Sequence, residues 1–208
     1  VINRPPEAPI DHLLVLACQI SAITAQDLLF GPTLRKFPSL KVALSEGGIG
    51  WIPFYFDRID RHYSNQTWLH GDTPFSPDGK SPSQVFQDHI LACFITDPSG
   101  LLLRDRIGID NIAWECDYPH TDTTWPNSPE FTWDELQTAG CSAEEIDKIT
   151  YQNACRFFDW DPFTKKTKEE STVGALRANA AAAGVDTTRK PRSEWKKENE
   201  AAGVGVFA

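Results

Sequence analysis

Residues 111–120 read NIAWECDYPH, and this stretch decides the fold. The apolar run over Asn111–Cys116 does not alternate with polar residues, so it predicts a strand that is buried on both faces. Asp117 follows directly and stands at the head of the turn Tyr118-Pro119-His120. Strands of this kind belong to parallel sheets with helices outside, so the stretch indicates an α/β protein.

The same order, an apolar run followed by a turn with an acidic residue, occurs twice earlier in the chain. A short apolar run at Leu40–Leu44 is followed at once by a glycine turn that contains Glu46, and a run at Ile90–Ile95 is followed by Asp97. Strand, turn and helix in this order predict βα units and a parallel sheet. The spacing of apolar residues predicts helices at Ser21–Phe37, Ile49–Tyr63, Ser83–His89, Leu101–Ile107 and Ser142–Asn153, with loops at Ser64–Ser81 and after His120.

The charge balance excludes two classes of partner. The 208 residues include 20 Lys and Arg against 29 Asp and Glu, which gives a net charge of −9. A nucleic-acid-binding protein needs a basic surface to neutralise phosphates, and a protein that binds anionic membranes needs one too. The longest apolar run, Leu13–Cys18, is far shorter than the roughly 20 residues that span a bilayer. We therefore expect no nucleic-acid partner and no membrane partner.

The five cysteines stand far apart in the chain, and no CxxC pair occurs. An odd number at wide spacing argues against a disulfide framework and against a structural zinc knuckle. Reduced thiols are the simpler interpretation, and they predict a cytoplasmic protein.

The chain begins with Val1 and contains no methionine, although a primary translation product begins with one. We therefore expect a processed chain or a fragment. The composition changes near residue 164, because the sequence from there onward is charged and alanine-rich and has few large apolar residues. We predict a globular part over residues 1–163 and a tail over residues 164–208 that is partly disordered or packs on a partner.

The candidate site residues follow the predicted strands. Reactive groups in parallel α/β proteins gather beyond the carboxyl ends of the strands, where the chain has Glu46, Asp97 and Asp117, with His120 close behind. Several carboxylates at one edge repel each other unless a cation lies between them, so the pattern favours a divalent metal ion. Asp97 fits better as the N-cap of a helix, and Glu46 can equally well bind the amides of its own glycine turn. Asp117 is the strongest candidate, because the rigid turn after it would aim its carboxylate.

Four stretches in order resemble one known family. They are Phe37–Pro53, Arg58–Arg61, Ile109–His120 and Ile149–Phe158. Together they are similar to the amidohydrolase-related proteins of the metal-dependent hydrolase superfamily, in the branch that contains aminocarboxymuconate-semialdehyde decarboxylase and the resorcylate decarboxylases. The resemblance extends over residues 1–163, and four motifs in order are more specific than any one of them.

The resemblance implies a (β/α)8 TIM barrel with its active site at the carboxyl ends of the strands. It implies that Asp117 is a metal ligand, because the aspartate at the end of the eighth strand binds the metal in this family, often zinc. The family's ligands on the first and fifth strands have no match, so the chain corresponds to about strands six to eight, with an incomplete metal site. Many decarboxylases of the family have a histidine where this chain has Glu46. A carboxylate at this position is expected to be a proton-transfer group or a further metal ligand, and it does not act by the chemistry of a neutral imidazole.

The hypothesis is a metal-dependent hydrolase that acts on a small, carboxylated or cyclic substrate. Its expected catalytic residues are Asp117 and Glu46, and His120, Trp51 and Arg58 are expected to bind the substrate. A non-oxidative decarboxylase of the same family is one alternative, and an inactive truncated barrel or assembly module is another. The incomplete ligand set predicts weak retention of the metal, and the open edges of a partial sheet predict a homo-oligomer.

Overall fold

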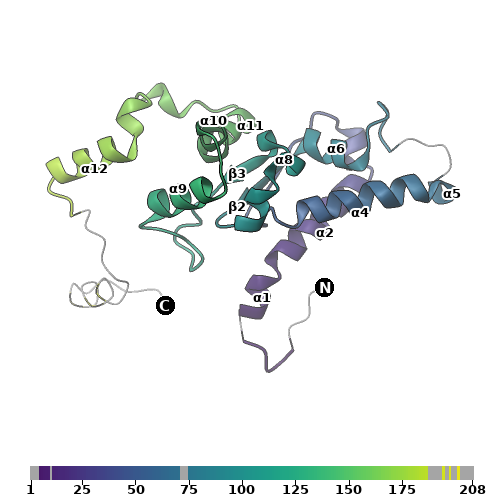
Figure 1. The fold of residues 1–208 in the computed structure, drawn as a ribbon, viewed down its shortest axis with the longest axis horizontal. Coiled ribbons are helices and arrows are strands. Elements are labelled where there is room, and N and C mark those ends of the chain that lie inside the picture. Colours follow the sequence, from purple (N-terminus) through teal and green to yellow (C-terminus); the bar gives the residue numbers. More distant parts are fainter. Residues whose placement is uncertain are drawn as a thin grey trace. The chain divides into compact units, whose positions relative to one another are not determined.

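The computed structural model describes residues 5–9, 11–70 and 75–186, with single positions at 194, 197 and 201. It divides the chain into two compact units, Val1–Trp160 and Asp161–Ala208 (Figure 1). The boundary that we predict from composition, after residue 163, lies slightly further along the chain than this division. All the candidate site residues fall in the first unit.

The first unit is built on a parallel sheet of three strands. They are β1 (Val42–Leu44), β2 (Ile90–Phe94) and β3 (Ile112–Trp114), in that order across the sheet. Both neighbouring pairs run parallel. The predicted α/β class and the parallel sheet are confirmed, although each strand is shorter than the apolar run that predicts it.

Helices cover one face of the sheet. Side chains alternate between the two faces of a strand, and Ile90 and Phe94 of β2 belong to the main core together with residues of the helices. Leu91 and Cys93 point to the other face and belong to a small separate cluster. Phe157 packs against this second cluster. A parallel sheet with the main helical layer on one face is the arrangement found in the wall of a barrel.

Helical segments follow each strand in turn. After β1 come α4 (Ile52–Asn65), α5 (Thr67–His70) and α6 (Pro82–His89); after β2 come α7 (Pro98–Leu102), α8 (Arg104–Ile107) and η1 (Ile109–Asn111); after β3 come α9 (Ser128–Thr138), α10 (Ala143–Asp147), η2 (Lys148–Gln152) and α11 (Asn153–Phe157). Helix α4 packs on α6 and α8, whereas the π-helical turn η2 and helix α11 pack on β3 (Figure 1).

Helix α4 shows how the sequence pattern produces packing. Ile52, Phe56 and Ile59 recur at helical spacing, and all three are buried. Pro53 stands in the first turn, where its missing N–H costs no hydrogen bond. The helix begins slightly later than predicted, because residues 45–50 form the turn that leads away from β1.

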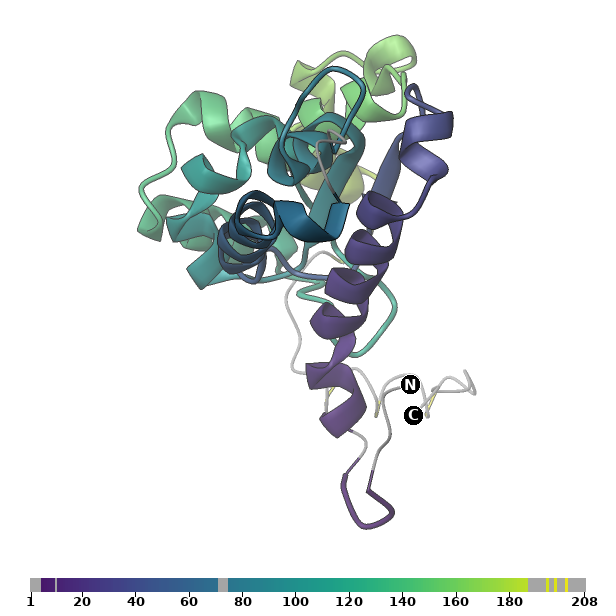
Figure 2. The same ribbon diagram turned by 90° about the vertical axis from the view of Figure 1, so that its right-hand side faces the viewer.

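The predicted helix over Ser21–Phe37 is wrong in its extent. The structure has α1 (Asp11–Val15) and α2 (Ala17–Phe30), which follow one another along one line in Figure 2, and then α3 (Thr33–Lys36). The break falls at Gly31-Pro32, because proline has no amide donor and disfavours helical backbone in the residue before it.

Two helices lie in regions that the sequence predicts as loops, namely α5 within Ser64–Ser81 and α9 after His120. Helix α9 escapes prediction because Pro126 and Pro129 suggest a loop, yet Pro129 stands in the first turn of the helix, where proline is tolerated. The single helix predicted over Leu101–Ile107 is also wrong, since two short helices, α7 and α8, meet at Leu103.

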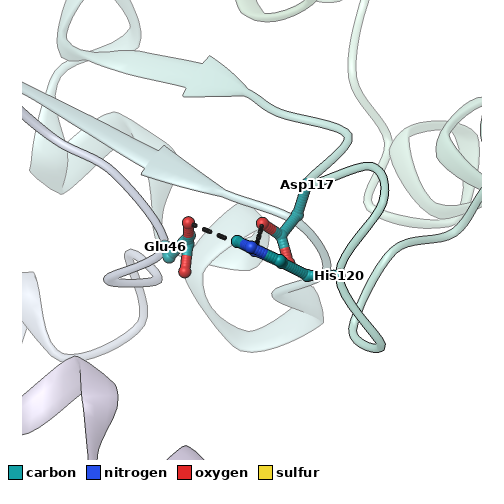
Figure 3. A group of neighbouring side chains, drawn as sticks. All are labelled: Glu46, Asp117 and His120. Atoms are coloured by element: carbon teal, nitrogen blue, oxygen red, sulfur yellow. Dashed lines mark hydrogen bonds and ion pairs between the residues drawn. The ribbon is translucent and has the colours of Figure 1, made fainter. Parts of the chain in front are cut away.

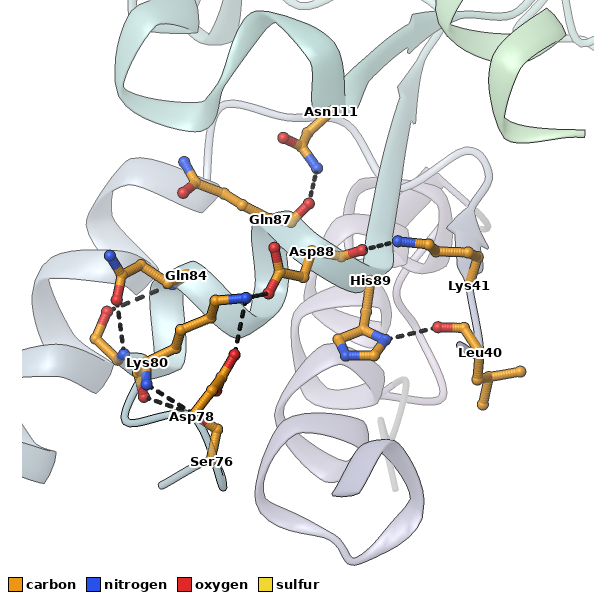
Figure 4. A network of polar contacts seen from close by, with 11 residues as sticks. Leu40, Lys41, Ser76, Asp78, Lys80, Gln84, Gln87, Asp88, His89 and Asn111 are labelled. Carbon is orange, nitrogen blue, oxygen red and sulfur yellow. Dashed lines mark hydrogen bonds and ion pairs between the residues drawn. The ribbon is translucent and has the colours of Figure 1, made fainter. Parts of the chain in front are cut away.

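At the start of each strand, a side chain from a later segment donates hydrogen bonds to backbone carbonyl oxygens. His89 Nδ1 donates a hydrogen bond to the carbonyl oxygen of Leu40, just before β1, at 2.6 Å. Asn111 Nδ2 donates to the carbonyl oxygens of Gln87 and Ile90, at the start of β2, at 2.6 and 2.9 Å. Figure 4 shows the Leu40 contact and the Gln87 contact on either side of α6.

Asn153 does the same at the start of β3 and is fully buried. Its Nδ2 donates to the carbonyl oxygens of Ile109 and Ile112 at 2.7 and 2.8 Å, while its Oδ1 accepts from Arg156. These contacts satisfy backbone carbonyls that parallel strands leave open at their amino ends. The amino edge of the sheet is therefore held by structural side chains, as is usual in barrels.

A polar network surrounds the start of α6 (Figure 4). Lys80 Nζ lies 2.9 Å from Asp78 and 2.7 Å from Asp88, and Ser76 donates to Asp78. The hydrogen bonds from Ser76 and Lys80 lower the pKa of Asp78 to about 2. The three charged side chains are 42 to 55% exposed, so these ion pairs contribute little to stability.

Acid is expected to weaken the fold through Glu145. Arg104 binds both carboxylate oxygens of Glu145, at 2.7 and 3.3 Å, and the two side chains are 14% and 21% exposed. These hydrogen bonds lower the pKa of Glu145 from 4.5 to about 2. A lowered carboxyl pKa gives stability that is complete above pH 4.5 and is lost as the pH falls toward 2. After allowance for solvent screening, the contribution is about 2 kcal/mol.

Glu145→Gln should therefore lose about 2 kcal/mol of unfolding free energy near pH 7 and much less near pH 3. Urea unfolding of the chain at both pH values measures the difference. Asp105→Asn is the matched control, because Asp105 is an exposed carboxylate next to the same arginine. An equal loss for Glu145→Gln at both pH values would show that the pair has no role in acid sensitivity.

The second unit contains η3 (Pro162–Thr164), η4 (Glu169–Ser171) and α12 (Val173–Ala182). Thr172 caps α12 by accepting a hydrogen bond from the amide of Ala175. The alanine-rich segment thus forms a helix, while most of the charged segment 189–200 lies outside the described residues. In the part of the chain that the structure describes, no helix has the length and apolar character needed to cross a membrane.

Candidate active site at the carboxyl edge of the sheet

The chain turns sharply after β1 and after β3. Glu46 and Asp117 follow these strands, and both have left-handed backbone, with φ of 57° and 55°. This conformation costs a non-glycine residue about 1 kcal/mol or more, so it persists only where the surrounding contacts fix it. The two turns bring the two carboxylates to the same edge of the sheet.

Figure 3 shows the ring of His120 between the carboxylates of Glu46 and Asp117. His120 Nδ1 donates to Asp117 Oδ1 at 2.7 Å and lies 3.9 Å from Glu46 Oε1. The hydrogen bond to Asp117, and then the charges of both carboxylates, raise the pKa of His120. The Asp117 side chain is 6% exposed, whereas those of Glu46 and His120 are 52% and 69% exposed. The cluster therefore consists of one buried carboxylate beneath two solvent-exposed groups.

Asp97 lies at the same edge of the sheet, but its carboxylate binds backbone amides. Its Oδ2 accepts from the amides of Ile49 and Gly50 at 2.7 and 2.6 Å, and its Oδ1 accepts from Gly100 at 2.8 Å. The last contact caps α7, as the sequence predicts. The carboxylate that binds the amides of Ile49 and Gly50 is thus Asp97 and not Glu46.

Close packing keeps the turn and α7 together. A Cβ atom at Gly100 would lie 2.3 Å from Cγ1 of Ile49 and 2.8 Å from the amide nitrogen of Gly50. Only glycine leaves room for this approach, so residue 100 is fixed by packing.

Sequence reasoning missed Glu115, the first residue after β3. Its backbone N–H donates to the carbonyl oxygen of Phe94 at 3.0 Å, and its Oε1 accepts the N–H of Glu46. Burial raises the pKa of Glu115, and the nearby charges of Glu46 and Asp117 also raise it. The sequence contained one signal for this role: Glu115 is a charged residue within a buried apolar run, and a buried charge needs a polar partner.

Trp51 and Arg58 are the two remaining residues that we expect to bind substrate. The indole N–H of Trp51 donates to the carbonyl oxygens of Gly47 and Gly48, both at 3.0 Å. Arg58 lies on α4 and is exposed, with its Nη2 2.6 Å from Nε2 of His62 on the next turn. The structure thus gives Trp51 a part in holding the glycine turn and pairs Arg58 with a residue of its own helix.

Two aromatic residues on the loop after Asp117 were also missed. The rings of Tyr118 and Trp125 have centroids 4.8 Å apart, and the residues are 59% and 49% exposed. Pro119 and Pro126 follow them through cis peptide bonds. An exposed pair of rings next to a charged cluster suits the recognition of a planar organic molecule. The signal in the sequence was the repeated pattern of an aromatic residue before proline.

The three clustered groups suit a divalent ion. Among the residues that the structure describes, Glu46, Asp117 and His120 offer ligand atoms that all lie within 4.8 Å of one another. Carboxylate oxygen and imidazole nitrogen are ligands for both zinc and manganese. The buried carboxylate of Asp117 has His120 as one partner, and a divalent ion would offset the cost of burying its charge further. The residues present therefore fit a divalent metal.

Comparison with protein families gives a match to the family described as amidohydrolase, over residues 9–160. No curated protein matches the chain.

Several solved structures are similar to the chain. One is an amidohydrolase from Mycobacterium avium subsp. paratuberculosis K-10, with 21% sequence identity and a TM-score of 0.58. Another is 5-carboxyvanillate decarboxylase from Sphingomonas paucimobilis, with 23% identity and a TM-score of 0.52. A third is dihydroxybenzoic acid decarboxylase from Polaromonas sp. JS666, with bound manganese and the inhibitor 2-nitroresorcinol, at 20% identity and a TM-score of 0.52.

These alignments cover 74%, 68% and 74% of the chain, but 36%, 40% and 48% of the three neighbours. The chain thus spans less than half the length of each neighbour. The likeness shows the fold, which is that of a TIM barrel, and the three described parallel strands form a part of it. The barrel that we predict from the family resemblance is confirmed, as a partial domain.

Proposed function

Because the chain belongs to the amidohydrolase family, we propose that it forms part of a metal-dependent hydrolase. The proposed substrate is a small molecule that is carboxylated or cyclic. One observation carries the proposal: Glu46, Asp117 and His120 come together at the carboxyl edge of a parallel sheet. Proteins with this architecture bind their ligands at that edge.

In this proposal each of the three residues has its own role. Asp117 would hold a divalent ion, since a cation would balance its buried charge together with His120. The chemistry that such an ion supplies when bound is the polarisation of a substrate oxygen. His120 would keep the Asp117 carboxylate oriented through Nδ1 and would contact the substrate from the exposed side. Glu46, half exposed and opposite His120, would offer the ion a second carboxylate and would exchange a proton with the substrate.

Decarboxylation is the second candidate reaction. Two neighbours are by name decarboxylases of 5-carboxyvanillate and dihydroxybenzoic acid, which are carboxylated aromatic compounds. The exposed rings of Tyr118 and Trp125 support an aromatic substrate, because they can stack on a planar ring. The products separate the two reactions: a decarboxylase releases carbon dioxide, whereas a hydrolase consumes water and releases none. Trp51 and Arg58 stay predictions as substrate-binding residues.

Metal binding through Asp117 tests the proposal. We expect the chain to bind Mn²⁺ or Zn²⁺ weakly, and Asp117→Ala to reduce the affinity about a hundredfold or to below detection, because it removes the buried ligand. Isothermal titration calorimetry with each metal chloride measures the affinity. The matched control is Asp122→Ala, which removes an exposed carboxylate from the same loop and should leave the affinity unchanged. Equal affinities of the unaltered chain and Asp117→Ala would contradict the proposal.

Three finer points also belong to the proposal. The metal is expected to be zinc, although the neighbour from Polaromonas contains manganese, so both ions enter the titration. A cytoplasmic location rests on the cysteines, of which Cys93, Cys116 and Cys141 are free thiols. A homo-oligomer is expected because β1 and β3 are edge strands of the described sheet. Sedimentation analysis of the chain measures the oligomeric state.

A further inference from the structure

We propose that Glu115 is a positioning residue for Glu46. Its carboxylate accepts the backbone N–H of Glu46 and so holds the turn that aims the Glu46 side chain at His120 and Asp117. The inference rests on the proposed function, because it assigns to Glu46 a role in the site. It adds a residue that sequence reasoning assigned only to a strand.

The sheet explains why Glu115 reaches this position. Cys93 of β2 pairs with Ala113 of β3, so Glu115, two residues further, points to the same face as these two residues. Its backbone is held by the hydrogen bond to Phe94 of β2, and its side chain extends past the end of β2 to the turn after β1. One carboxylate therefore links the ends of the two outer strands of the sheet.

The conformation of Glu46 explains what the contact does. Its left-handed φ of 57° is unfavourable for a residue with a side chain, so the surroundings must fix it. Its side chain is 52% exposed, so packing does little to fix its direction. The direction of the Glu46 side chain therefore depends on the backbone conformation of Glu46. Glu115 stabilises that conformation, because its carboxylate accepts the N–H of Glu46 itself. Asp97 binds the other end of the same turn, at the amides of Ile49 and Gly50.

The inferred role needs a hydrogen-bond acceptor and not a charge. A glutamine at position 115 has a carbonyl oxygen that can accept the same N–H, whereas an alanine has no acceptor. The pair Glu115→Gln and Glu115→Ala therefore separates positioning from a direct electrostatic effect on the metal. Asn111→Ala is the control for general destabilisation, because Asn111 fastens the opposite, amino edge of the sheet.

Amide hydrogen exchange followed by NMR tests the hold on Glu46 without any metal. In Glu115→Ala the amide of Glu46 should exchange at least about tenfold faster, relative to the amides of Ile49 and Gly50 in the same sample. Glu115→Gln should keep the original ratio, and so should Asn111→Ala. Titration with Mn²⁺ should show an affinity about tenfold lower for Glu115→Ala, with little change for the other two variants.

Two results would overturn the inference. An unchanged exchange ratio in Glu115→Ala would mean that Glu115 does not hold the turn. If the Glu46 amide of Glu115→Ala exchanged faster but the Mn²⁺ affinity were unchanged, the hydrogen bond from Glu46 to Glu115 would not orient the Glu46 side chain. Failure of the proposed function looks different, because the unaltered chain would then bind no Mn²⁺, and the exchange ratio alone would decide for or against Glu115.

Discussion

Asp97→Ala is expected to destabilise the chain by about 4 kcal/mol. The Asp97 carboxylate accepts hydrogen bonds from Ile49, Gly50 and Gly100 at 2.6 to 2.8 Å. Hydrogen bonds to an ionised acceptor contribute more than neutral ones, and each donor left without a partner costs about 1 to 3 kcal/mol. Gly100 is buried and the turn residue Ile49 is fully buried, so water cannot easily replace the lost acceptor.

Urea unfolding of the purified chain measures this loss. The isosteric variant Asp97→Asn is the matched control, because it keeps one carbonyl acceptor and should lose about half as much. A loss below about 1 kcal/mol for Asp97→Ala would contradict the assignment of these contacts as structural. The exchange of the Ile49 and Gly50 amides should also become faster, whereas the Glu46 amide keeps its acceptor on Glu115.

Asn153→Ala is expected to cost about 3 kcal/mol at the opposite edge of the sheet. Asn153 is fully buried, and its amide group satisfies the carbonyl oxygens of Ile109 and Ile112. Alanine leaves both oxygens unsatisfied and opens a small cavity beside β3, and these two costs add. The metal affinity should not change, since Asn153 acts at the amino end of the strand.

A near-isosteric variant sharpens this second prediction. Asn153→Asp keeps the shape of the side chain but turns a donor into an acceptor that faces two carbonyl oxygens, so it should destabilise at least as much as alanine. Asn111→Ala, which removes the equivalent contact from a half-buried position, should cost about half as much. If Asn153→Asp proved harmless in thermal unfolding, the donated hydrogen bonds would not be what holds β3.

The strands were predictable because a buried parallel strand has a recognisable sequence pattern, a short apolar run without alternating polar residues. Leu40–Leu44 and Ile90–Ile95 are short apolar runs that end in polar turns, and such runs are too short for a buried helix of ordinary length. The N-cap role of Asp97 was predictable for a similar reason, because an aspartate before proline at the start of a helix satisfies local backbone donors. Both inferences use neighbours in the sequence only.

The remaining features depend on contacts between residues far apart in the chain. The left-handed backbone of Glu46 is held by Glu115, and no local pattern around residue 46 reveals that acceptor. Asp97 was expected to cap one helix, but its binding of Ile49 and Gly50 follows only from the order of the strands. Tertiary contacts thus decide the details of the site, whereas local patterns decide the class of the fold.

The turn over residues 45–50 has a consequence for protein engineering. Its amides at Glu46, Ile49 and Gly50 find their acceptors on Glu115 and Asp97, outside the turn itself. A graft of these six residues into another barrel would carry the Glu46 carboxylate but neither acceptor, and the grafted segment would relax to a different shape. The smallest transferable piece of this site is therefore the whole span from β1 through His120, which includes Asp97 and Glu115 and is exchanged as one block.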